Sequence, residues 1–469
     1  MVKTKIICTL GPASRSENVI KKLIGASMDC ARINMSHGTP ETVLPYIQKV
    51  KKLRTETKRP IAIMIDTKGP ECRIGVFKNG EVFLKKNQLF TLYNKNINGD
   101  ETGVSYSYKN LFEDVAVGSK ILVNDGLIVL KVVSIENKNI ITKVEVGGRL
   151  TNRKSMFIPG VKLKIPFLTN QDKQDLKFAC EQDADFVAAS FVSSKEDVLS
   201  LRKFLDNNGG KDIKIISKIE SAVGIKNIDE IIDVSDGVMV ARGDLGVEMK
   251  IEKLPELQKM IIEKTLDKGK LSITATEMLE SMTKSIRPTR AEVSDVANAV
   301  YDKSGAIMLS AETSVGVNPE NVVKTMAKIA KSAEENKKYI TLSTDFSRRD
   351  SAESLCHSAC LFAKEINAKA IVVFTETGKT ACLMSKFRPE QPILALTPNK
   401  KVYNQLALCY NVESMQAKMI SSVEKIIEEA CTGAKKSGFA KSGDDIVITI
   451  GFPFAKGRKT NTVISAKIK

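Results

Sequence analysis

Several short segments place charged and oxygen-bearing side chains at spacings that suit a phosphate group and a metal ion. In the segment Arg32–Ser36, polar and apolar residues alternate, so in a strand Arg32, Asn34 and Ser36 share one face. The segment Lys218–Glu220 likewise puts a lysine and a carboxylate on one face. Cationic side chains neutralise phosphates, whereas side-chain oxygens suit hard cations. Chemistry on a phosphorylated substrate is therefore indicated.

A further set of oxygen ligands follows the apolar run Ile61–Ile65. Asp66 and Thr67 come directly after that run, and Asn34 and Ser36 end an earlier one. Together these four residues offer oxygen atoms that carry one formal negative charge. Such a set suits a monovalent or weakly held cation.

A second carboxylate, Asp244, follows the apolar run Gly237–Ala241. Mg²⁺ typically takes one or two protein carboxylates and completes its shell with substrate oxygens and water, so Glu220 and Asp244 could hold it together. Lys218 could then neutralise charge on a transferring phosphoryl group. Gly243 has no side chain and lets the backbone approach a ligand closely.

These segments occupy equivalent places in a repeating pattern of apolar runs and amphipathic stretches. Such a pattern implies a parallel sheet buried on both faces, and eight units close a (β/α)8 barrel. In that fold the reacting groups lie where strands end, which is where the polar segments fall. The strands are expected at Lys5–Leu10, Cys30–Met35, Ile61–Ile65, Phe186–Phe191, Ile213–Ile219, Gly237–Ala241, Leu271–Thr276 and Ala306–Leu309.

The same pattern predicts an α/β protein of three domains. Residues 1–69 and 157–336 form the (β/α)8 TIM barrel. Residues 70–156 carry short strands and turn signals such as Asn79-Gly80, which predict an inserted small β-barrel lid domain. The α/β alternation returns in residues 337–469, which predicts a C-terminal open-sheet domain.

Composition excludes several classes of protein. The net charge of +17 suits a lysine-rich surface or a field that concentrates anionic substrates, but the chain has no tryptophan and only 5% aromatic residues. Nucleic acid is therefore not an expected partner. No apolar run approaches the roughly 20 residues that span a bilayer, so no membrane contact is expected. Nine cysteines without a CxxC pair predict a reduced, cytoplasmic protein.

The chain resembles pyruvate kinases over essentially its whole length. The resemblance implies phosphoryl transfer from phosphoenolpyruvate to ADP, which gives pyruvate and ATP in the final step of glycolysis. It also implies Mg²⁺ (or Mn²⁺) and K⁺ as cofactors, a homotetramer, and a lid that closes to exclude water. The segments that carry it are Thr4–Ile6, Gly11–Ser14, Arg32–Gly38, Asp66–Glu71, Lys218–Glu220, Met239–Gly246, Ala275–Met282 and Arg287–Ala299.

The resemblance further implies roles for individual residues. Lys218 would stabilise the phosphoryl group in flight, and a relayed water near Thr276 and Ser310 would protonate the enolate. The implied catalytic residues are Lys218, Arg32, Thr276 and Ser310. Those on phosphoenolpyruvate are Arg32, Lys218, Gly243, Asp244 and Thr276, and those on the nucleotide are Asn34, Ser36, His37, Arg73 and Lys154. The implied metal ligands are Glu220 and Asp244 for Mg²⁺, and Asn34, Ser36, Asp66 and Thr67 for K⁺.

A few positions depart from the family pattern. Glu71 matches members that require K⁺, whereas Ile74 resembles the K⁺-independent pattern. Glu277 stands where the family usually has glutamine, and Ala311 replaces a usual glycine. None of these positions is a predicted metal ligand or the predicted catalytic lysine, so an active enzyme is expected.

A helix start in the C-terminal domain is a candidate effector site. Thr375–Thr380 follows a predicted strand, and its hydroxyls and N–H groups suit either a phosphate cradle or a capped helix. The resemblance implies a phosphorylated allosteric effector there, completed by the loop Gly457–Thr460. The predicted contacts are Thr375, Thr377, Gly378, Lys379 and Thr380.

Two other functions stay open. Another metal-dependent enolpyruvate barrel enzyme, an aldolase or a mutase, uses similar carboxylates, although the inserted domain and the Arg32–Gly38 segment argue against it. A catalytically silent basic binding protein is the second, and salt-dependent affinity for DNA without turnover would favour it. The intact set Arg32, Lys218, Glu220 and Asp244 argues against silence.

Overall fold

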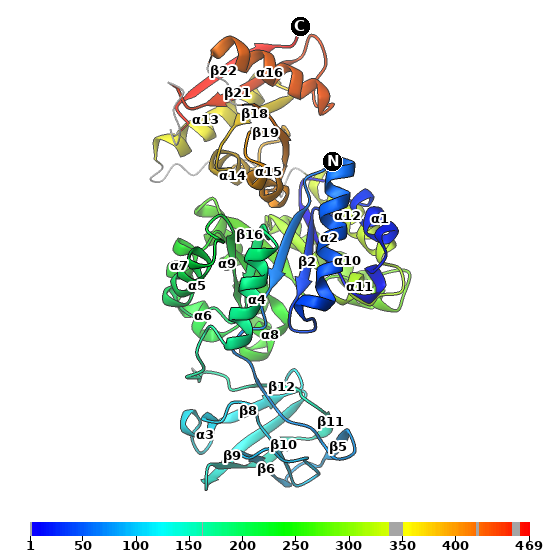
Figure 1. Ribbon diagram of the computed structural model, residues 1–469, viewed down its shortest axis with the longest axis vertical. Coiled ribbons are helices and arrows are strands. Elements are labelled where there is room, and N and C mark those ends of the chain that lie inside the picture. Colours follow the sequence, from blue (N-terminus) through cyan, green and yellow to red (C-terminus); the bar gives the residue numbers. More distant parts are fainter. Residues whose placement is uncertain (1, 162, 337–349, 419–421, 453–459) are drawn as a thin grey trace.

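The computed structural model describes residues 2–161, 163–336, 350–418, 422–452 and 460–469. Three domains follow one another along the long axis of the molecule, with the barrel in the middle (Figure 1). The C-terminal domain covers one end of the barrel and the inserted domain lies beyond the other. The expected domain start at residue 337 lies outside the described residues.

The central domain is a closed barrel of eight parallel strands, which confirms the predicted fold class. Its strands pair in the order β1-β17-β16-β15-β14-β13-β3-β2, and β2 closes the ring on β1. The strands are β1 (Lys5–Thr9), β2 (Cys30–Asn34), β3 (Ala62–Asp66), β13 (Phe186–Ala189), β14 (Lys214–Ile219), β15 (Gly237–Ala241), β16 (Leu271–Ala275) and β17 (Ala306–Leu309).

Helices surround the barrel, and α1, α4, α5 and α10 each begin at a Ser or Thr whose side chain caps the helix. Helix α10 begins with a capping box: the Thr289 side chain accepts from the Glu292 N–H, and the Glu292 side chain accepts from the Thr289 N–H. The helices are α1 (Glu17–Gly25), α2 (Pro40–Thr57), α4 (Asn170–Glu181), α5 (Lys195–Asn207), α6 (Ala222–Lys226), α7 (Ile228–Val234), α8 (Arg242–Glu248), α9 (Leu254–Asp267), α10 (Arg290–Tyr301), α11 (Ala311–Ser314) and α12 (Pro319–Glu334), with 3-10 turns η1 (Pro12–Ser14), η2 (Ile251–Lys253) and η3 (Glu280–Thr283).

Alternate side chains of the barrel strands enter two different hydrophobic cores. Ile6 and Cys8 of β1 lie in the core between strands and helices. Ile7 lies in an inner core that fills the half of the barrel where the strands begin, and this core continues into the C-terminal domain through residues such as Ala359 and Ile371. The barrel and the C-terminal domain therefore share one apolar interior.

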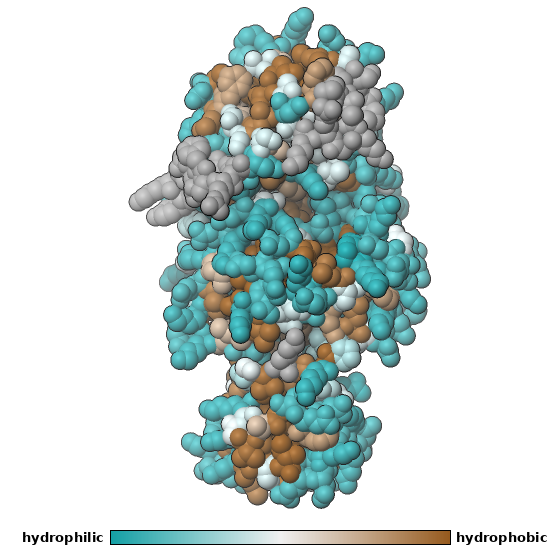
Figure 2. All heavy atoms as spheres, turned by 90° about the vertical axis from the view of Figure 1, so that its left-hand side faces the viewer, coloured by the Kyte–Doolittle hydropathy of each residue, from teal (hydrophilic) through white to brown (hydrophobic). Residues whose placement is uncertain are grey.

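The inserted domain is a curled sheet with its own core around Phe90, Leu92 and Tyr106. A narrow neck joins it to the barrel (Figure 2). Seven strands pair in the order β4-β12-β8-β9-β10-β6-β7, and β11 pairs with β5. The elements are β4 (Cys72–Arg73), β5 (Glu81–Leu84), β6 (Leu89–Tyr93), β7 (Gly103–Ser105), α3 (Leu111–Asp114), β8 (Lys120–Val123), β9 (Ile128–Glu136), β10 (Asn139–Val146), β11 (Gly148–Thr151) and β12 (Ser155–Phe157).

The C-terminal domain is a five-stranded sheet, ordered β20-β19-β18-β21-β22, with helices on both faces. Only β22 runs antiparallel to its neighbour within this sheet. The elements are α13 (Ser351–Glu365), β18 (Ala370–Phe374), α14 (Lys379–Lys386), β19 (Ile393–Thr397), α15 (Lys400–Gln405), η4 (Leu406–Leu408), β20 (Val412–Gln416), α16 (Val423–Lys436), β21 (Asp445–Ile450) and β22 (Thr462–Lys467).

Hydrogen bonds attach the C-terminal domain to the end of the barrel at which the strands begin. Lys401 donates to the Asp183 and Ala184 carbonyls just before β13, and Lys5 of β1 donates to the Val412 carbonyl at 2.8 Å. Gln405 donates to the Asp212 carbonyl before β14. The opposite end of the barrel, where the strands finish, is left for the inserted domain.

The nine cysteines are all free, as the sequence predicts. Burial raises the pKa of Cys8, Cys30 and Cys360 well above the ordinary thiol value, which keeps these core thiols protonated. Within the described part of the chain, no helix combines the length and the apolar character that crossing a membrane requires.

One buried carboxylate on α4 yields a prediction about pH and stability. Asp175 is fully buried, and burial raises its pKa to about 6. The folded chain therefore binds a proton between the unfolded pKa of about 4 and pH 6 that the unfolded chain does not bind, so this group costs stability as the pH rises through that window. We expect Asp175→Asn to stabilise the protein by on the order of 1 kcal/mol at pH 8, with a gain that shrinks toward pH 4.

Thermal unfolding at pH 4.5 and pH 8 measures this difference. The exposed Asp212, on the loop before β14, gives the control variant Asp212→Asn, for which no pH-dependent gain is expected. A gain that is the same at both pH values, or a loss at pH 8, contradicts the prediction.

Candidate active site

The end of the barrel where the strands finish contains a buried carboxylate between two cations. Asp66, the last residue of β3, is 1% exposed. Arg32 of β2 donates from Nε to Asp66 Oδ2 at 2.6 Å, and Lys218 of β14 donates from Nζ to Asp66 Oδ1 at 3.2 Å. Burial disfavours the charged form of Asp66, but the two cations outweigh burial and lower its pKa. The predicted alternation of β2 and β14 therefore brings these cations to one place.

Lys218 is the centre of a wider network. Its Nζ lies 2.9 Å from Glu220 Oε1 and donates to Ser190 Oγ at 2.7 Å. Burial disfavours the ammonium, yet Asp66 and Glu220 together raise the pKa of Lys218. The Lys218 side chain thus stays charged at neutral pH, which suits the role of a fixed cation rather than that of a proton donor.

Glu220 and Asp244 meet beside Lys218 as two carboxylates in contact. Glu220 Oε2 accepts from the Phe191 N–H at 2.6 Å, which aims the carboxylate. Burial, and then the neighbouring Glu220 charge, raises the pKa of Asp244 to about 8. Two adjacent buried carboxylates repel one another unless a proton or a cation lies between them. The donor set therefore fits a divalent cation that takes two protein carboxylates.

Gly243 and Thr276 meet where β15 and β16 end. The Gly243 N–H donates to Thr276 Oγ1 at 2.9 Å, and this hydroxyl donates to the Ala275 carbonyl at 2.6 Å. Thr276 and Glu277 are both in the left-handed region, at φ 68° and 51°. A Cβ at Gly243 would lie 3.8 Å from the Thr276 side chain, which is an ordinary van der Waals contact.

The four residues predicted to bind K⁺ lie on neighbouring strands. Asn34 and Asp66 are register partners of β2 and β3. Asn34 Oδ1 accepts from the Ser36 N–H at 3.1 Å, and the Thr67 carbonyl accepts from Ser190 Oγ at 2.7 Å. The set consists of oxygen atoms only, with one formal negative charge, which fits a monovalent cation.

The residues predicted to contact the nucleotide lie toward the inserted domain. Arg73 of β4 pairs with Ser155 of β12, next to Lys154, so these two cations are neighbours at the two roots of that domain. Arg73 forms a bidentate ion pair with Glu71, at 2.8 and 2.9 Å. Nucleotide phosphates would therefore have to compete with the Glu71 carboxylate for Arg73. His37 lies exposed on the loop after β2.

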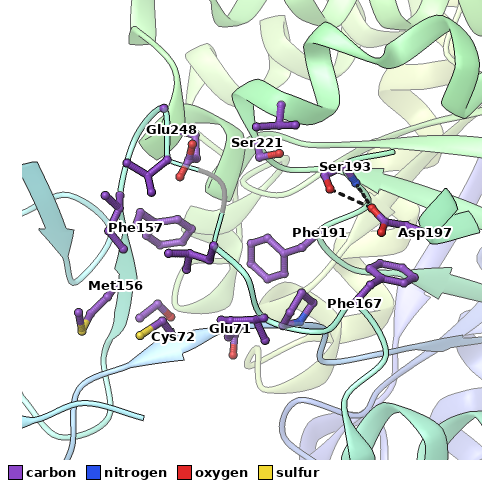
Figure 3. A pocket seen from close by; sticks show the side chains of 18 residues that line it. Glu71, Cys72, Met156, Phe157, Phe167, Phe191, Ser193, Asp197, Ser221 and Glu248 are labelled. Atoms are coloured by element: carbon purple, nitrogen blue, oxygen red, sulfur yellow. Dashed lines mark hydrogen bonds between the residues drawn. The ribbon is translucent and has the colours of Figure 1, made fainter. Parts of the chain in front are cut away.

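A cavity of about 150 Å³ separates the root of the inserted domain from the barrel. Its walls are the aromatic rings of Phe157, Phe167 and Phe191, with Glu71 and Glu248 at the rim (Figure 3). Phe191, whose side chain lines this cavity, is also the residue whose N–H donates to Glu220.

Ser310, directly after β17, is held by a buried carboxylate. Its N–H donates to Glu312 Oε2 at 2.6 Å, and the other Glu312 oxygen accepts from the Leu279 N–H at 3.1 Å. Glu277, which stands where the family usually has glutamine, is exposed. Ala311 begins α11 in ordinary helical backbone. Neither substitution disturbs the network around Lys218.

The predicted effector residues form the start of α14. Gly378 has φ 80°, and its N–H donates to Thr375 Oγ1 at 2.9 Å. The hydroxyls of Thr380 and Thr460 are 2.7 Å apart, so the loop after β21 reaches this helix start. Thr377 and Lys379 lie on the same turn. Gly457, Arg458 and Lys459 are outside the described residues.

Sequence reasoning missed two residues of this site. Ser190 follows β13, which the sequence predicts to continue to Phe191; the strand ends at Ala189 because Phe191 has φ 57°. The apolar Phe191 hides this turn in the sequence. Thr9, at the end of β1, accepts from Arg32 Nη1 at 2.9 Å, and its place at a strand end was the available signal.

Comparison with known proteins decides the family. A family model described as "Pyruvate kinase, barrel domain" matches residues 1–323, and one described as "Pyruvate kinase, alpha/beta domain" matches residues 353–464. The chain belongs to the pyruvate kinase family. It is 46% identical over 474 positions to a pyruvate kinase from Clostridium perfringens (strain 13 / Type A), with 100% of each chain covered.

Two further pyruvate kinases match nearly the whole of this chain. The protein from Clostridium acetobutylicum is 43% identical over 465 positions, which cover 98% of each chain. The protein from Geobacillus stearothermophilus is 41% identical over 464 positions, which cover 98% of this chain and 79% of that protein. Family membership favours a pyruvate kinase over the aldolase, mutase and silent binding-protein alternatives.

The buried ion pairs of the active site yield a prediction about the stability of the folded chain. Asp66→Asn leaves Arg32 and Lys218 as buried cations without their shared partner, so we expect the free energy of unfolding to fall by about 3 to 5 kcal/mol at pH 7.5. Because the folded pKa of Asp66 is lowered, its contribution is present above the unfolded value and is lost as the pH falls through the folded pKa.

Urea denaturation followed by circular dichroism at pH 7.5 tests this expectation. The control is Asp229→Asn, which removes the exposed ion pair with Lys264 and should cost less than about 1 kcal/mol. Equal losses for the two variants would show that the buried pairs do not stabilise the barrel.

Proposed function

We propose that the chain transfers the phosphoryl group of phosphoenolpyruvate to ADP and releases pyruvate and ATP. In this reaction the bond from phosphorus to the enol oxygen breaks, and a bond from phosphorus to an oxygen of the ADP β-phosphate forms. The enolate left behind takes a proton at carbon. One observation carries the proposal: Lys218, Arg32 and the Glu220–Asp244 pair converge at one end of the barrel.

Lys218 and Arg32 are the groups proposed to face the phosphoryl group. Both are already held by Asp66, so neither has to reorganise when charge moves from one oxygen to the other. Fixed cations in a site sheltered from water stabilise a transferring phosphoryl group more than mobile cations do. The raised pKa of Lys218 supports this electrostatic role and argues against a role as the acid that protonates the enolate.

The cofactors are proposed from the donor sets. Glu220 and Asp244 would hold Mg²⁺ or Mn²⁺, and Asn34, Ser36, Asp66 and the Thr67 carbonyl would hold K⁺. Bound there, the cations would neutralise negative charge on the substrate phosphates. The contribution of the chain is to present these oxygens at the ends of four barrel strands, β2, β3, β14 and β15, beside Lys218.

Thr276 and Gly243 are proposed to hold the carboxylate of phosphoenolpyruvate. Gly243 has no side chain to obstruct a ligand, and its N–H and the Thr276 hydroxyl, which are hydrogen-bonded to each other, are the polar groups of this cradle. Protonation of the enolate is proposed to proceed through a water near Thr276 and Ser310. Arg73, Lys154, His37, Asn34 and Ser36 are proposed to face the nucleotide.

The inserted domain is proposed to act as a lid. Water competes with ADP for the phosphoryl group, so transfer requires a site that closes before reaction. The cavity between Phe157, Phe167 and Phe191 supports this role, because it leaves space between the root of the inserted domain and the barrel into which a closing lid can move. We also propose a cytoplasmic homotetramer and a phosphorylated effector at Thr375, Thr377, Gly378, Lys379 and Thr380.

Lys218→Met provides the direct test. We expect pyruvate release that depends on phosphoenolpyruvate, ADP and Mg²⁺ in the wild type, and a fall in kcat of about 100-fold or more in the variant, because a fixed cation is removed from the transition state. The control is Lys401→Met at the opposite end of the barrel. The Lys401 side chain is 11% exposed, like that of Lys218, and also makes several hydrogen bonds and ion pairs.

Lys401→Met is expected to lower stability but to keep the wild-type kcat. Wild type without turnover under any monovalent cation, with sugar-phosphate activators added, would reject the proposed function. Equal loss of kcat in both variants would reject the special role of Lys218.

The monovalent cation gives a separate prediction. Replacing K⁺ with tetramethylammonium, which is too large for the Asn34, Ser36, Asp66 and Thr67 oxygens, should lower kcat several-fold at saturating substrates. Re-adding K⁺ should restore the rate, and matched ionic strength in both buffers is the control. An unchanged rate would place the chain with the K⁺-independent members, in agreement with Ile74 rather than Glu71.

A further inference from the structure

Arg242 joins the ends of two neighbouring barrel strands. It follows β15 directly, and its side chain is 10% exposed. The Nε atom donates to the Ala275 carbonyl at 3.1 Å, and Nη2 donates to the Thr276 carbonyl at 2.6 Å. One guanidinium group therefore holds the carbonyl oxygens on both sides of the Thr276 α-carbon.

The third arm of this guanidinium is fixed as well. Nη1 donates to Asp295 Oδ1 of α10 at 2.7 Å. Three nitrogen atoms in one rigid plane thus bond to the Ala275 and Thr276 carbonyls and to Asp295, and Nη2 also donates to Met278 Sδ at 3.0 Å. A lysine cannot reproduce this arrangement, because its donors radiate from a single atom.

The segment that Arg242 holds has an unfavourable backbone conformation. Thr276 and Glu277 have positive φ in succession, and Thr276 is β-branched. L-residues pay roughly 1–2 kcal/mol each in the left-handed region, so surrounding contacts must hold the segment there. Arg242 is bonded to the backbone of Thr276 itself and is therefore placed to supply that constraint.

This backbone also determines where the Thr276 hydroxyl points. The hydroxyl donates to the Ala275 carbonyl, which is the same oxygen that Arg242 Nε holds, and accepts from the Gly243 N–H. Moving the Ala275 or Thr276 carbonyl would turn the hydroxyl away from Gly243. Arg242 thus acts on this cradle through the backbone, without having to reach it.

We propose that Arg242 is a positioning residue that holds Thr276 and Gly243 in the geometry that receives the substrate carboxylate. The proposal rests on the proposed function, which assigns the carboxylate of phosphoenolpyruvate to this cradle. It predicts an effect on the binding of one substrate, which a purely structural role does not predict.

Arg242→Lys and Arg242→Gln test this by steady-state kinetics. We expect the KM for phosphoenolpyruvate to rise by about 10-fold to 100-fold in both variants, with the KM for ADP nearly unchanged, because only the carboxylate cradle is misplaced. The lysine variant keeps the charge and should not rescue the effect. A shift in both KM values by the same factor would overturn the proposal.

Arg202 provides a matched control. Its guanidinium also bonds to two carbonyls and one carboxylate: Nη1 to Ile213, Nη2 to Gly210, and Nε to Asp206, at 2.7, 2.7 and 2.9 Å. It lies before β14, at the end of the barrel away from the site. Arg202→Lys is expected to lower the thermal midpoint and to keep the KM for phosphoenolpyruvate.

A double-mutant cycle separates positioning from general stability. In a Thr276→Val background the hydroxyl is already gone, so Arg242→Lys should reduce kcat/KM for phosphoenolpyruvate much less than it does in the wild type. Equal reductions in the two backgrounds would overturn the proposal while the proposed function stands. If the wild type shows no turnover, the proposed function fails. The rise in the thermal midpoint of unfolding on adding phosphoenolpyruvate then replaces the kinetic comparison. A rise of the same size in Arg242→Lys overturns the positioning role.

Discussion

The carboxylate of Asp66 is the group around which the active site is organised. A buried charge costs several kcal/mol unless partners surround it, and here Arg32 and Lys218 approach it from two other strands. The two cations are consequently in place before any substrate arrives. The two ion pairs of Asp66 with Arg32 and Lys218, which the folded protein needs even without substrate, thus also prepare a site for a highly charged phosphate group.

The same strands serve two opposite purposes along their length. Toward their beginnings, side chains such as Ile7 and Met64 fill the barrel with apolar volume. At their ends the inward positions change to Thr9, Arg32 and Asp66. The apolar half provides the rigidity, and the polar half uses it, because side chains on packed strands hold their geometry better than side chains on loops do.

The sequence predicts this arrangement to the level of strands and their final residues. Strand periodicity and the rule that barrel strands end at the site were enough to bring Arg32, Asp66, Lys218 and Glu220 together. What it could not predict depends on backbone turns. Phe191 continues an apolar run, so the neighbouring sequence does not predict its positive φ or the hydrogen bond that Ser190 accepts from Lys218. The carbonyl contacts of Arg242 likewise depend on a neighbouring strand 34 residues away.

The interior shared by the barrel and the C-terminal domain bears on how members of this family can be recombined. Ala359 and Ile371 of the C-terminal domain belong to the same hydrophobic core as Ile7 of the barrel. The packing of apolar side chains is therefore continuous across the junction between the two domains. A chimera that exchanges whole C-terminal domains would transplant part of a core and leave its complement behind. A successful exchange would have to include the inward-facing residues from the half of the barrel where the strands begin, together with the new domain. Those residues and the residues of α13 are expected to have changed together as the family diverged.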